Sequence, residues 1–290
     1  MSTIEKALAK QKHNKENEQD LSKNSTVISE QELSTNVNPE KTNHVSPTLK
    51  INKDDLLKRG YLIKSDERKN IKDELRPIKR KLLDNAFGKA SKMLNFSNLI
   101  MVTSARPNEG KTFVAINLAL SIALEQDKTV LLIDADVLRP SICRELGFDE
   151  RLGLTEYLSG EVNQISDVLN NTNIEKLKVI SAGKSHHLSN ELLASERMIS
   201  LAKELATRYP DRVVIFDCPP LLGISETYVL ADLVGQAVIV VEESKTYIEE
   251  VKKATQNLNE DLAIGLVINK AISSHQDMYG YYGYGSSEKG

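Results

Sequence analysis

The sequence predicts an α/β fold in which a mostly parallel sheet is flanked by helices on both faces. Short runs rich in β-branched residues recur along the chain, and helical patterns such as KTFVAINLALSIALEQ and NELLASERMISLAKELATRY lie between them. Apolar strands that alternate with helices are typical of parallel sheets, which are buried on both faces. The runs are NLIMVTS, TVLLIDAD, KLKVISAG, RVVIFDCPP, QAVIVVEES and AIGLVINK.

Residues 1–70 are predicted to form a short helix followed by a mostly disordered linker. The stretch STIEKALAK places Ile4 and Leu8 on one side of a helix. From Gln11 to about Asn52 the chain is polar, and its few aliphatic residues bury too little surface to offset the conformational entropy of folding. Two interpretations of the first ten residues stay open: a frayed end, or a segment that docks onto a partner.

The folded domain is predicted to cover residues 71–272 and to begin with the charged helix DELRPIKRKLLDNAF. Sheets of this class carry their sites at the carboxyl ends of the strands. Residues 273–290 are predicted to form a flexible tail, because glycines separate the tyrosines of MYGYYGYGSS and make an ordered helix or strand costly. Four of the nine tyrosines lie in this tail: Tyr279, Tyr281, Tyr282 and Tyr284.

Charge and composition exclude several classes of protein. The net charge of −3 provides no global basic field, so we expect no nucleic-acid partner. Cys143 and Cys218 lack the spacing of a metal or redox motif, which favours a reducing cytoplasmic setting. The N-terminus lacks the apolar core of a secretory signal, and no apolar run approaches the ~20 residues that span a bilayer. We therefore expect a cytoplasmic protein with no direct membrane span, recruited to the inner face of the cell membrane by a partner.

A phosphate-binding loop is predicted between NLIMVTS and the helix that follows it. The segment ARPNEGKT matches the Walker A pattern at Gly110, Lys111 and Thr112, whereas Ala105 takes the place of the first glycine. Gly110 permits close approach of a backbone whose N–H groups wrap a phosphate. Lys111 supplies positive charge to the β and γ oxygens of ATP, and the Thr112 hydroxyl is a ligand for Mg²⁺. The expected nucleotide contacts also include Asn108, Glu109 and Phe113.

Carboxylates directly follow two of the predicted strands. LLIDAD ends with Asp134 and Asp136, and VVIFD ends with Asp217. Since these strands end at the same edge of the sheet as the loop, we expect Asp217 to hold Mg²⁺ as a Walker B residue does, with Thr112 and Asp134. One carboxylate of Asp134 and Asp136 would accept the proton of an attacking hydroxyl, and Lys111 would act with them in catalysis. The alternative for a single Asp in such a place is a helix cap.

The motifs NEGKTFVAINLA, VLLIDADVLRP and VVIFDCPPLL, in this order, resemble the Walker A, Walker A′ and Walker B motifs of the bacterial tyrosine kinases. Those are P-loop enzymes unrelated to the eukaryotic protein-kinase fold. The resemblance covers roughly residues 70–290. The stretches STIEKAL, LRPIKRKLLDNAFG and DADVLRPS look most similar to the tyrosine autokinases of exosortase-linked exopolysaccharide systems. The family's C-terminal tyrosine cluster matches YGYYGY.

The resemblance implies a P-loop NTPase fold, ATP and Mg²⁺ as cofactors, and autophosphorylation of the four tail tyrosines between subunits of a homo-oligomer. A neutral phenol is a poor nucleophile until a carboxylate accepts its proton, which Asp134 or Asp136 would do. The resemblance further implies control of exopolysaccharide synthesis and export. It also implies an activating partner, a membrane polysaccharide co-polymerase that determines chain length.

The sequence departs from the family's pattern at several positions. Cys218 follows the Walker B aspartate, where many members carry Ser or Thr, and Leu138 occupies the usual place of the Walker A′ arginine. The family's Glu-x-x-Arg-x-x-Arg helix, which contacts a neighbouring subunit, is matched only by conservative changes, and a solvated charged helix is the alternative. The matching residues are Asp73, Arg76 and Lys79.

Three further residues have open interpretations. Asn269 ends AIGLVINK, where related P-loop proteins read adenine with an Asn amide, and a strand-end turn residue is the alternative. His186 and His187 lie in the polar stretch GKSHHLSN without companion ligands, so no metal site is predicted there.

Two other functions stay open beside a kinase. A positioning ATPase like MinD or ParA shares the fold and the motif order. Most of those carry an additional lysine early in the loop, where this chain reads Ser104-Ala105-Arg106-Pro107. The other candidate is a scaffold that binds nucleotide without turnover and recruits a polysaccharide machine.

Overall fold

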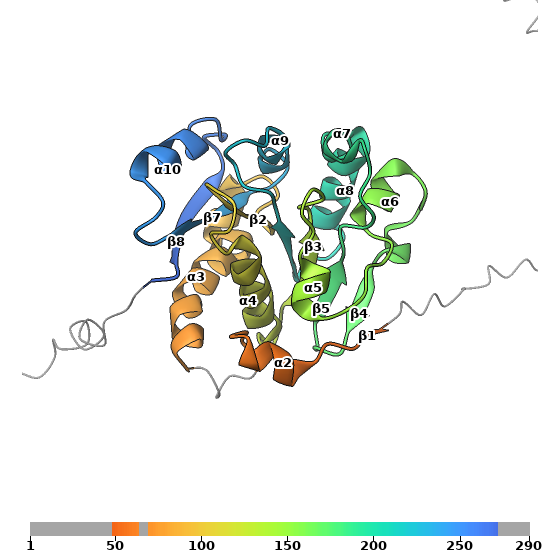
Figure 1. The fold of residues 1–290 in the computed structure, drawn as a ribbon, viewed down its shortest axis with the longest axis horizontal. Helices are drawn as coiled ribbons and strands as arrows, with labels where there is room; N and C mark the ends of the chain where they lie inside the picture. Colours follow the sequence, from red (N-terminus) through yellow and green to blue (C-terminus); the bar gives the residue numbers. More distant parts are fainter. Residues whose placement is uncertain (1–47, 64–68, 272–290) are drawn as a thin grey trace, which may run out of the picture. The chain divides into compact units, whose positions relative to one another are not determined.

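The computed structural model describes residues 48–63 and 69–271, which all lie in one compact unit, His44–Gly290 (Figure 1). The predicted N-terminal helix, most of the predicted linker and the four tail tyrosines therefore lie outside the described residues. The expected tail boundary near residue 272 stays a prediction for the same reason.

The described residues form an eight-stranded sheet in the order β1-β4-β5-β3-β6-β2-β7-β8. The β4–β5 pair is antiparallel, and all other neighbouring strands run parallel. The six runs predicted from the sequence form β2, β3, β5, β6, β7 and β8, so the predicted fold class is confirmed. The strands are β1 (Thr48–Leu49), β2 (Leu99–Ser104), β3 (Thr129–Asp134), β4 (Asn170–Thr172), β5 (Leu177–Ile180), β6 (Arg212–Asp217), β7 (Gln236–Glu242) and β8 (Ala263–Asn269).

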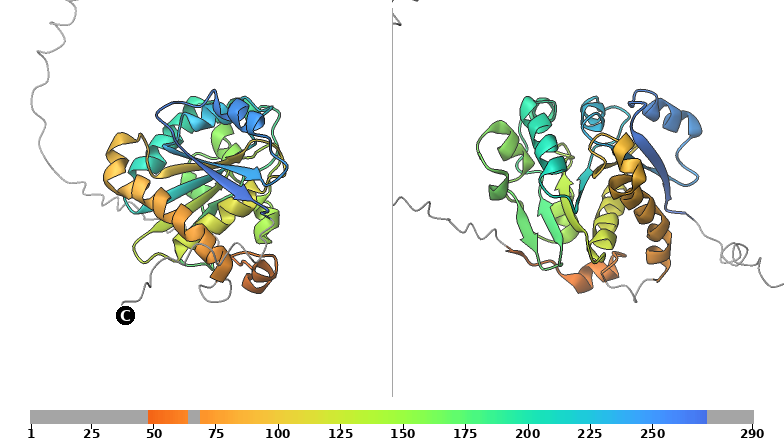
Figure 2. Two further views of the ribbon diagram at one scale, coloured as in Figure 1. Left: turned by 90° about the vertical axis from the view of Figure 1, so that its left-hand side faces the viewer. Right: turned by 180° about the vertical axis from the view of Figure 1, so that it is seen from behind.

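Helices cover both faces of this sheet (Figure 2). One face carries the phosphate-loop helix and three neighbours, whose apolar side chains join one core cluster with Ile100, Val102 and Val238. The charged helix predicted from DELRPIKRKLLDNAF is among them, and it buries Leu75, Leu82 and Ala86. These helices are α2 (Lys53–Lys58), α3 (Lys69–Phe87), α4 (Lys111–Ala123) and α5 (Ile142–Leu146), and a 3₁₀ turn, η1 (Lys89–Met93), follows α3.

The opposite face is covered by five helices around two further core clusters. Strand residues alternate between the faces: Met101 and Phe216 point to this side, whereas their neighbours Ile100 and Ile215 point to the other. The helices are α6 (Leu154–Ser159), α7 (Ser189–Leu193), α8 (Glu196–Thr207), α9 (Glu226–Ala231) and α10 (Ile248–Thr255), and a 3₁₀ turn, η2 (Ile165–Asp167), precedes β4.

The folded part begins earlier than the sequence predicts, because residues 48–63 belong to the core rather than to a linker. β1 pairs with β4, and the side chain of Asn52 caps α2 by accepting from the N–H groups of Asp54 and Asp55 at 3.1 Å each. The N–H of Leu62 donates to the Asn117 side chain on α4 at 2.9 Å. The buried apolar residues of this segment are Leu49, Ile51, Leu56, Tyr61 and Leu62.

Replacing Leu56 by Ala is expected to lower the free energy of unfolding by about 3 kcal/mol, because the deletion leaves a cavity in the core. The side chain of Leu56 is 1% exposed, whereas that of Leu152 is 46% exposed, so Leu152→Ala is the matched control. Urea unfolding measures both. Equal midpoints for the two variants would mean that the segment does not pack on the domain.

Candidate active site

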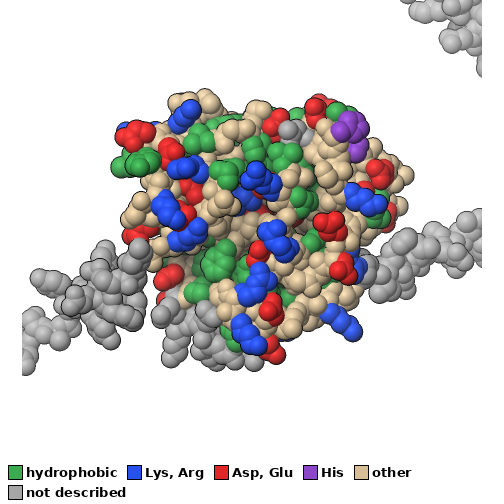
Figure 3. Space-filling view, in the orientation of Figure 1, with side chains coloured by type: hydrophobic (Ala, Val, Ile, Leu, Met, Phe, Trp, Pro, Cys, Tyr) green, Lys and Arg blue, Asp and Glu red, His purple; other side chains and the backbone are tan. Residues whose placement is uncertain are grey.

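The predicted Walker residues gather where β3, β6 and β2, three neighbouring strands, end, whereas Asn269 ends β8. A pocket of about 920 Å³ opens beside α4 and α5. Lys and Arg side chains gather down the middle of the face shown in Figure 3. The residues that line the pocket include Arg59, Arg139 and Arg144. Six predicted residues also line it: Asn108, Gly110, Lys111, Thr112, Phe113 and Asp136.

The phosphate loop reaches α4 through two left-handed residues, Asn108 (φ 69°) and Gly110 (φ 94°). A Cβ atom at residue 110 would lie 2.1 Å from Nδ2 of Asn269 and would displace that side chain, and the positive φ of this residue favours glycine in any case. This close approach explains the glycine of the motif. It also leaves the backbone of the loop turned toward a cavity that can receive phosphate.

Lys111 lies among the acidic residues. Its Nζ is 2.8 Å from Oδ2 of Asp136 and 3.4 Å from Oδ1 of Asp217. Burial is the largest influence on the pKa of Lys111 and lowers it, but attraction by Asp217 and Asp136 outweighs burial, so the pKa lies above its ordinary value. Lys111 is therefore a fixed positive charge at neutral pH.

The Thr112 hydroxyl donates to Oδ2 of Asp217 at 2.6 Å and lies 2.8 Å from the Ser141 hydroxyl. Burial raises the pKa of Asp217, and attraction by Lys111 and the hydrogen bond from Thr112 offset only part of the rise. A carboxylate and a hydroxyl are hard oxygen ligands that suit Mg²⁺. Within residues 48–63 and 69–271, no group of three or more His, Cys, Asp and Glu forms a cage for a metal ion. The Thr112 hydroxyl and the Asp217 carboxylate therefore suit a Mg²⁺ ion that keeps several of its waters and also binds substrate phosphates.

Asp134 is buried behind the pocket and organises the neighbouring loop. Its Oδ2 accepts from the N–H groups of Ser141 and Ile142 at 2.9 Å each. Burial and repulsion by Asp217 raise the pKa of Asp134 to about 7, and the two N–H donors counteract part of that rise. Asp134 and Asp217 repel each other when both carry a negative charge, so a cation placed between or beside them is stabilised.

Asp136 differs from Asp134 because it lines the pocket and pairs with Lys111. Its Oδ1 accepts only the Arg139 N–H at 3.1 Å, among the described residues. Of the two carboxylates predicted for proton transfer, Asp136 therefore lines the pocket, although its side chain is largely buried, and Asp134 lies behind it and accepts from backbone donors.

Two predicted nucleotide residues, Glu109 and Asn269, do not line this pocket. Glu109 is buried, and its carboxylate accepts from the Arg106 N–H at 2.7 Å and from the Thr246 hydroxyl. The Asn269 amide donates to the Glu109 carbonyl at 2.8 Å. Both side chains thus support the loop from behind.

Sequence reasoning missed several residues at the pocket, among them Ser141, Arg59 and Tyr61. Tyr61 packs against Phe113 with ring centroids 5.1 Å apart and donates to the Glu145 carboxylate at 2.8 Å. Arg59 and Tyr61 lie in the segment that the sequence predicts to be a linker, so no site role is expected of them. Ser141 ends the stretch DADVLRPS, but the sequence assigns it no role.

The residues expected at a subunit contact lie on α3. Asp73 and Arg76 are exposed. Lys79 is engaged within the subunit, since its Nζ is 2.5 Å from Oε1 of Glu125 and donates to the Ser121 carbonyl at 3.3 Å. The packing of α3 on α4 explains this pair.

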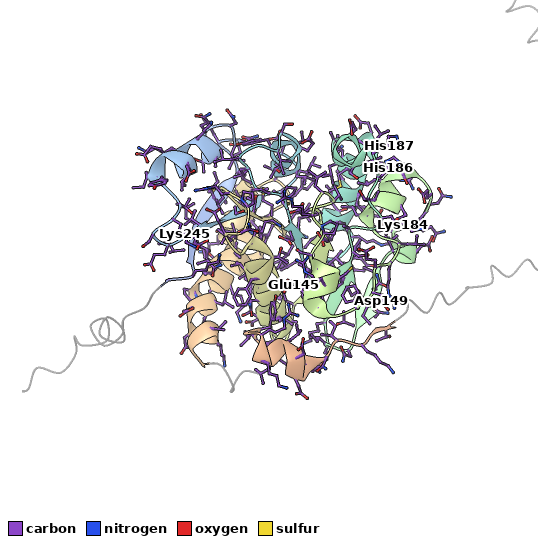
Figure 4. The ribbon with its side chains drawn as sticks, viewed as in Figure 1. Glu145, Asp149, Lys184, His186, His187 and Lys245 are labelled. Atoms are coloured by element: carbon purple, nitrogen blue, oxygen red, sulfur yellow. The ribbon has the colours of Figure 1, made fainter. Side chains whose placement is uncertain are left out.

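His186 and His187 lie beside α7, apart from Glu145 at the pocket (Figure 4). Their rings stack with centroids 4.3 Å apart, and Nδ1 of His186 accepts the Leu188 N–H.

Comparison with known proteins gives consistent results. Residues 97–264 match a family model described as an AAA domain. The chain is 35% identical over 187 residues to the tyrosine-protein kinase YwqD of Bacillus subtilis, covering 63% of this chain and 77% of that protein. Several other curated tyrosine-protein kinases are longer, and the chain spans only 21–27% of their length.

Solved structures show the same likeness. The kinase domain of the Escherichia coli tyrosine kinase ETK superposes with a TM-score of 0.59 at 30% identity, covering 71% of this chain and 80% of that one. The septum site-determining protein MinD of Pyrococcus horikoshii, solved with Mg-ADP, superposes with a TM-score of 0.51 at 22% identity, covering 61% and 72%. The second likeness shows the fold alone.

Proposed function

Because the chain belongs to the bacterial tyrosine kinase family, we propose that it transfers the γ-phosphoryl group of ATP to tyrosine hydroxyls. One observation supports this most directly. Lys111 and Thr112 at the start of α4 meet Asp136 and Asp217 from two other strand ends, with 2.6–3.4 Å between their polar atoms. Lys111, Thr112 and Asp136 line the pocket, and Asp217 is buried behind them. A cation, a hydroxyl and two carboxylates in such proximity are the groups that phosphoryl transfer requires.

The residues of the chain divide the reaction between them. Lys111 balances negative charge on the β and γ oxygens of ATP, and backbone N–H groups of the loop orient the phosphates. Thr112 and Asp217 would hold Mg²⁺, with Asp134 behind them, and the ion supplies further charge neutralisation when bound. Asp136 accepts the phenol proton as the tyrosine oxygen bonds to the γ-phosphorus and the bond from that phosphorus to the β–γ bridging oxygen breaks. ADP leaves with the negative charge.

The acceptors that we propose are Tyr279, Tyr281, Tyr282 and Tyr284, reached between subunits of a homo-oligomer. The sequence resemblance supports this choice. It likewise supports a cytoplasmic role in exopolysaccharide synthesis, the exosortase-linked subgroup, and a membrane co-polymerase as activator. Over the described residues, no helix combines the length and apolar character of a bilayer span.

Mapping of phosphorylated residues by mass spectrometry tests the proposal. Purified protein incubated with Mg²⁺ and ATP is expected to carry phosphate on tail tyrosines, and chelation of the metal is expected to prevent it. Phosphate confined to Ser or Thr, or ATP hydrolysis without any phosphoprotein, would contradict a tyrosine kinase.

A positioning ATPase like MinD is less well supported by the loop. Such proteins commonly place a second lysine early in the loop, where this chain carries Arg106. The Arg106 guanidinium lies 3.5 Å from Oε1 of Glu250 on α10, and it does not line the pocket. The site therefore receives its lysine charge from Lys111.

A further inference from the structure

The phosphate loop is held from behind by two consecutive residues at the end of β8. Asn269 donates its amide to the Glu109 carbonyl at 2.8 Å, and Lys270 donates its Nζ to the Asn108 carbonyl at 2.7 Å. Two successive carbonyls of the loop thus have partners on one side. These residues lie about 160 positions away from the loop in sequence.

These carbonyl contacts fix the direction of the next two N–H groups. In a planar trans peptide, the carbonyl of one residue and the N–H of the next point in opposite directions, and the described residues contain no cis peptide. Holding the carbonyls of Asn108 and Glu109 on the β8 side therefore turns the N–H groups of Glu109 and Gly110 away from β8. Neither N–H has an acceptor among the described residues, which suits donors reserved for phosphate.

Both ends of the Lys270 hydrogen bond have unusual backbones. Asn108 has a φ of 69° and Lys270 a φ of 58°, a region that side-chain-bearing residues rarely adopt. Such conformations persist where surrounding contacts enforce them, and they concentrate at functional sites. Here the contact is enforced by Glu242, whose Oε2 lies 2.8 Å from the Lys270 Nζ.

We infer that Asn269 and Lys270 are positioning residues that set the phosphate loop for the phosphate chain of a nucleotide, whatever base it carries, an inference that rests on the nucleotide binding of the proposed function. Asn269 is thereby assigned to the loop rather than to adenine. Its amide is 2.1 Å from where a Cβ of Gly110 would lie, and it is already donated to Glu109. Glu242 keeps the Lys270 ammonium in place.

Binding of ADP, GDP and inorganic tripolyphosphate, each with Mg²⁺, tests the assignment by calorimetry. Lys270→Met is expected to weaken all three by about 10-fold, the effect of losing one charged hydrogen bond. Lys270→Arg retains the charge and the donor, and it should recover most of the affinity. Asn269→Ala should weaken the three ligands to the same extent as one another.

Lys245→Met is the matched control. Lys245 lies beside the ends of β7 and β8 (Figure 4), and its Nζ is 2.5 Å from Oε1 of the same Glu242. Among the described residues, no hydrogen bond or ion pair links Lys245 to the phosphate loop. This variant removes the same charge from the same carboxylate and should leave binding unchanged. Equal losses for Lys245→Met and Lys270→Met would overturn the inference, because they would show a general charge effect.

Selectivity provides the second decisive outcome. If Asn269→Ala weakens ADP and spares GDP and tripolyphosphate, the amide reads the base and the inference fails. Melting temperatures of the ligand-free variants separate lost binding from lost folding. The proposed function fails separately: wild-type protein that binds nucleotide but forms no phosphotyrosine contradicts the kinase and leaves the positioning role standing.

Discussion

Replacing Tyr279, Tyr281, Tyr282 and Tyr284 together by Phe is expected to reduce phosphate incorporation from radiolabelled ATP to the level of a control without Mg²⁺. The change removes four oxygen atoms and keeps the rings, so the acceptor is lost while the described domain is untouched. A phenol is the nucleophile of the proposed reaction, and a phenyl ring has none to offer. Nucleotide binding by the same variant should equal that of the wild type.

The other five tyrosines provide the control for this experiment. Tyr61 and Tyr157 are buried, Tyr209 and Tyr228 are half-buried, and Tyr247 at the start of α10 is 68% exposed and is the most accessible alternative acceptor of the five. Tyr247→Phe alone should leave labelling unchanged. Undiminished labelling of the four-tyrosine variant would show that the tail is not the acceptor, and combining it with Tyr247→Phe would then identify whether α10 carries the phosphate.

Replacing Lys111 by Met is expected to slow tyrosine phosphorylation about 1,000-fold, the scale on which fixed charges stabilise transferring phosphoryl groups. The side chain keeps its length but loses the ammonium that lies 2.8 Å from Asp136 and 3.4 Å from Asp217. Those carboxylates would then repel ATP and each other without compensation. The rate of phosphotyrosine formation at saturating ATP measures the effect.

The matched control is Lys203→Met on the exposed side of α8, which should retain the wild-type rate. Circular dichroism and melting curves show whether Lys111→Met stays folded, since removing a buried partner of two acids also affects stability. A folded Lys111→Met protein with a rate within ~3-fold of the wild type would refute the role of Lys111 in transfer. Lost phosphotyrosine with retained nucleotide binding would support a kinase over a scaffold.

The sequence predicts the centre of this site well because its determinants are local. A strand, a turn and a helix follow one another in NLIMVTSARPNEGKT, and an acid ends each of two buried runs. The rule that parallel strands present their carboxyl ends at one edge then brings Asp134 and Asp217 together, and they are register partners in the sheet. The fold class follows from the same alternation of apolar runs and helical patterns.

Contacts between distant parts of the chain escape this reasoning. The segment 48–63 contains seven apolar residues, but the long polar stretch before it favours a linker. The partners Asn117, Phe113 and Glu145, which lie far along the chain, make the segment part of the core. Lys270 acts on a carbonyl 162 positions earlier in the chain, and no local pattern encodes such a pair. The interpretation of Asn269 as an adenine contact came from the resemblance, and its amide in the structure supports the loop.

The strand order places the first and the last described strand at opposite edges of the sheet. β1 and β8 are the outermost strands, and seven spacings of about 4.8 Å put them roughly 34 Å apart across the sheet. The chain enters the domain at β1, and it leaves from β8 beside the phosphate loop. A fluorescent protein or surface anchor fused ahead of Thr48 would attach at the edge strand farthest from Lys270 and its contact with the phosphate loop. The same cargo fused directly behind residue 271 would follow Lys270 and could obstruct the phosphate loop that Lys270 contacts. Reporters of this protein therefore belong on its N-terminal side.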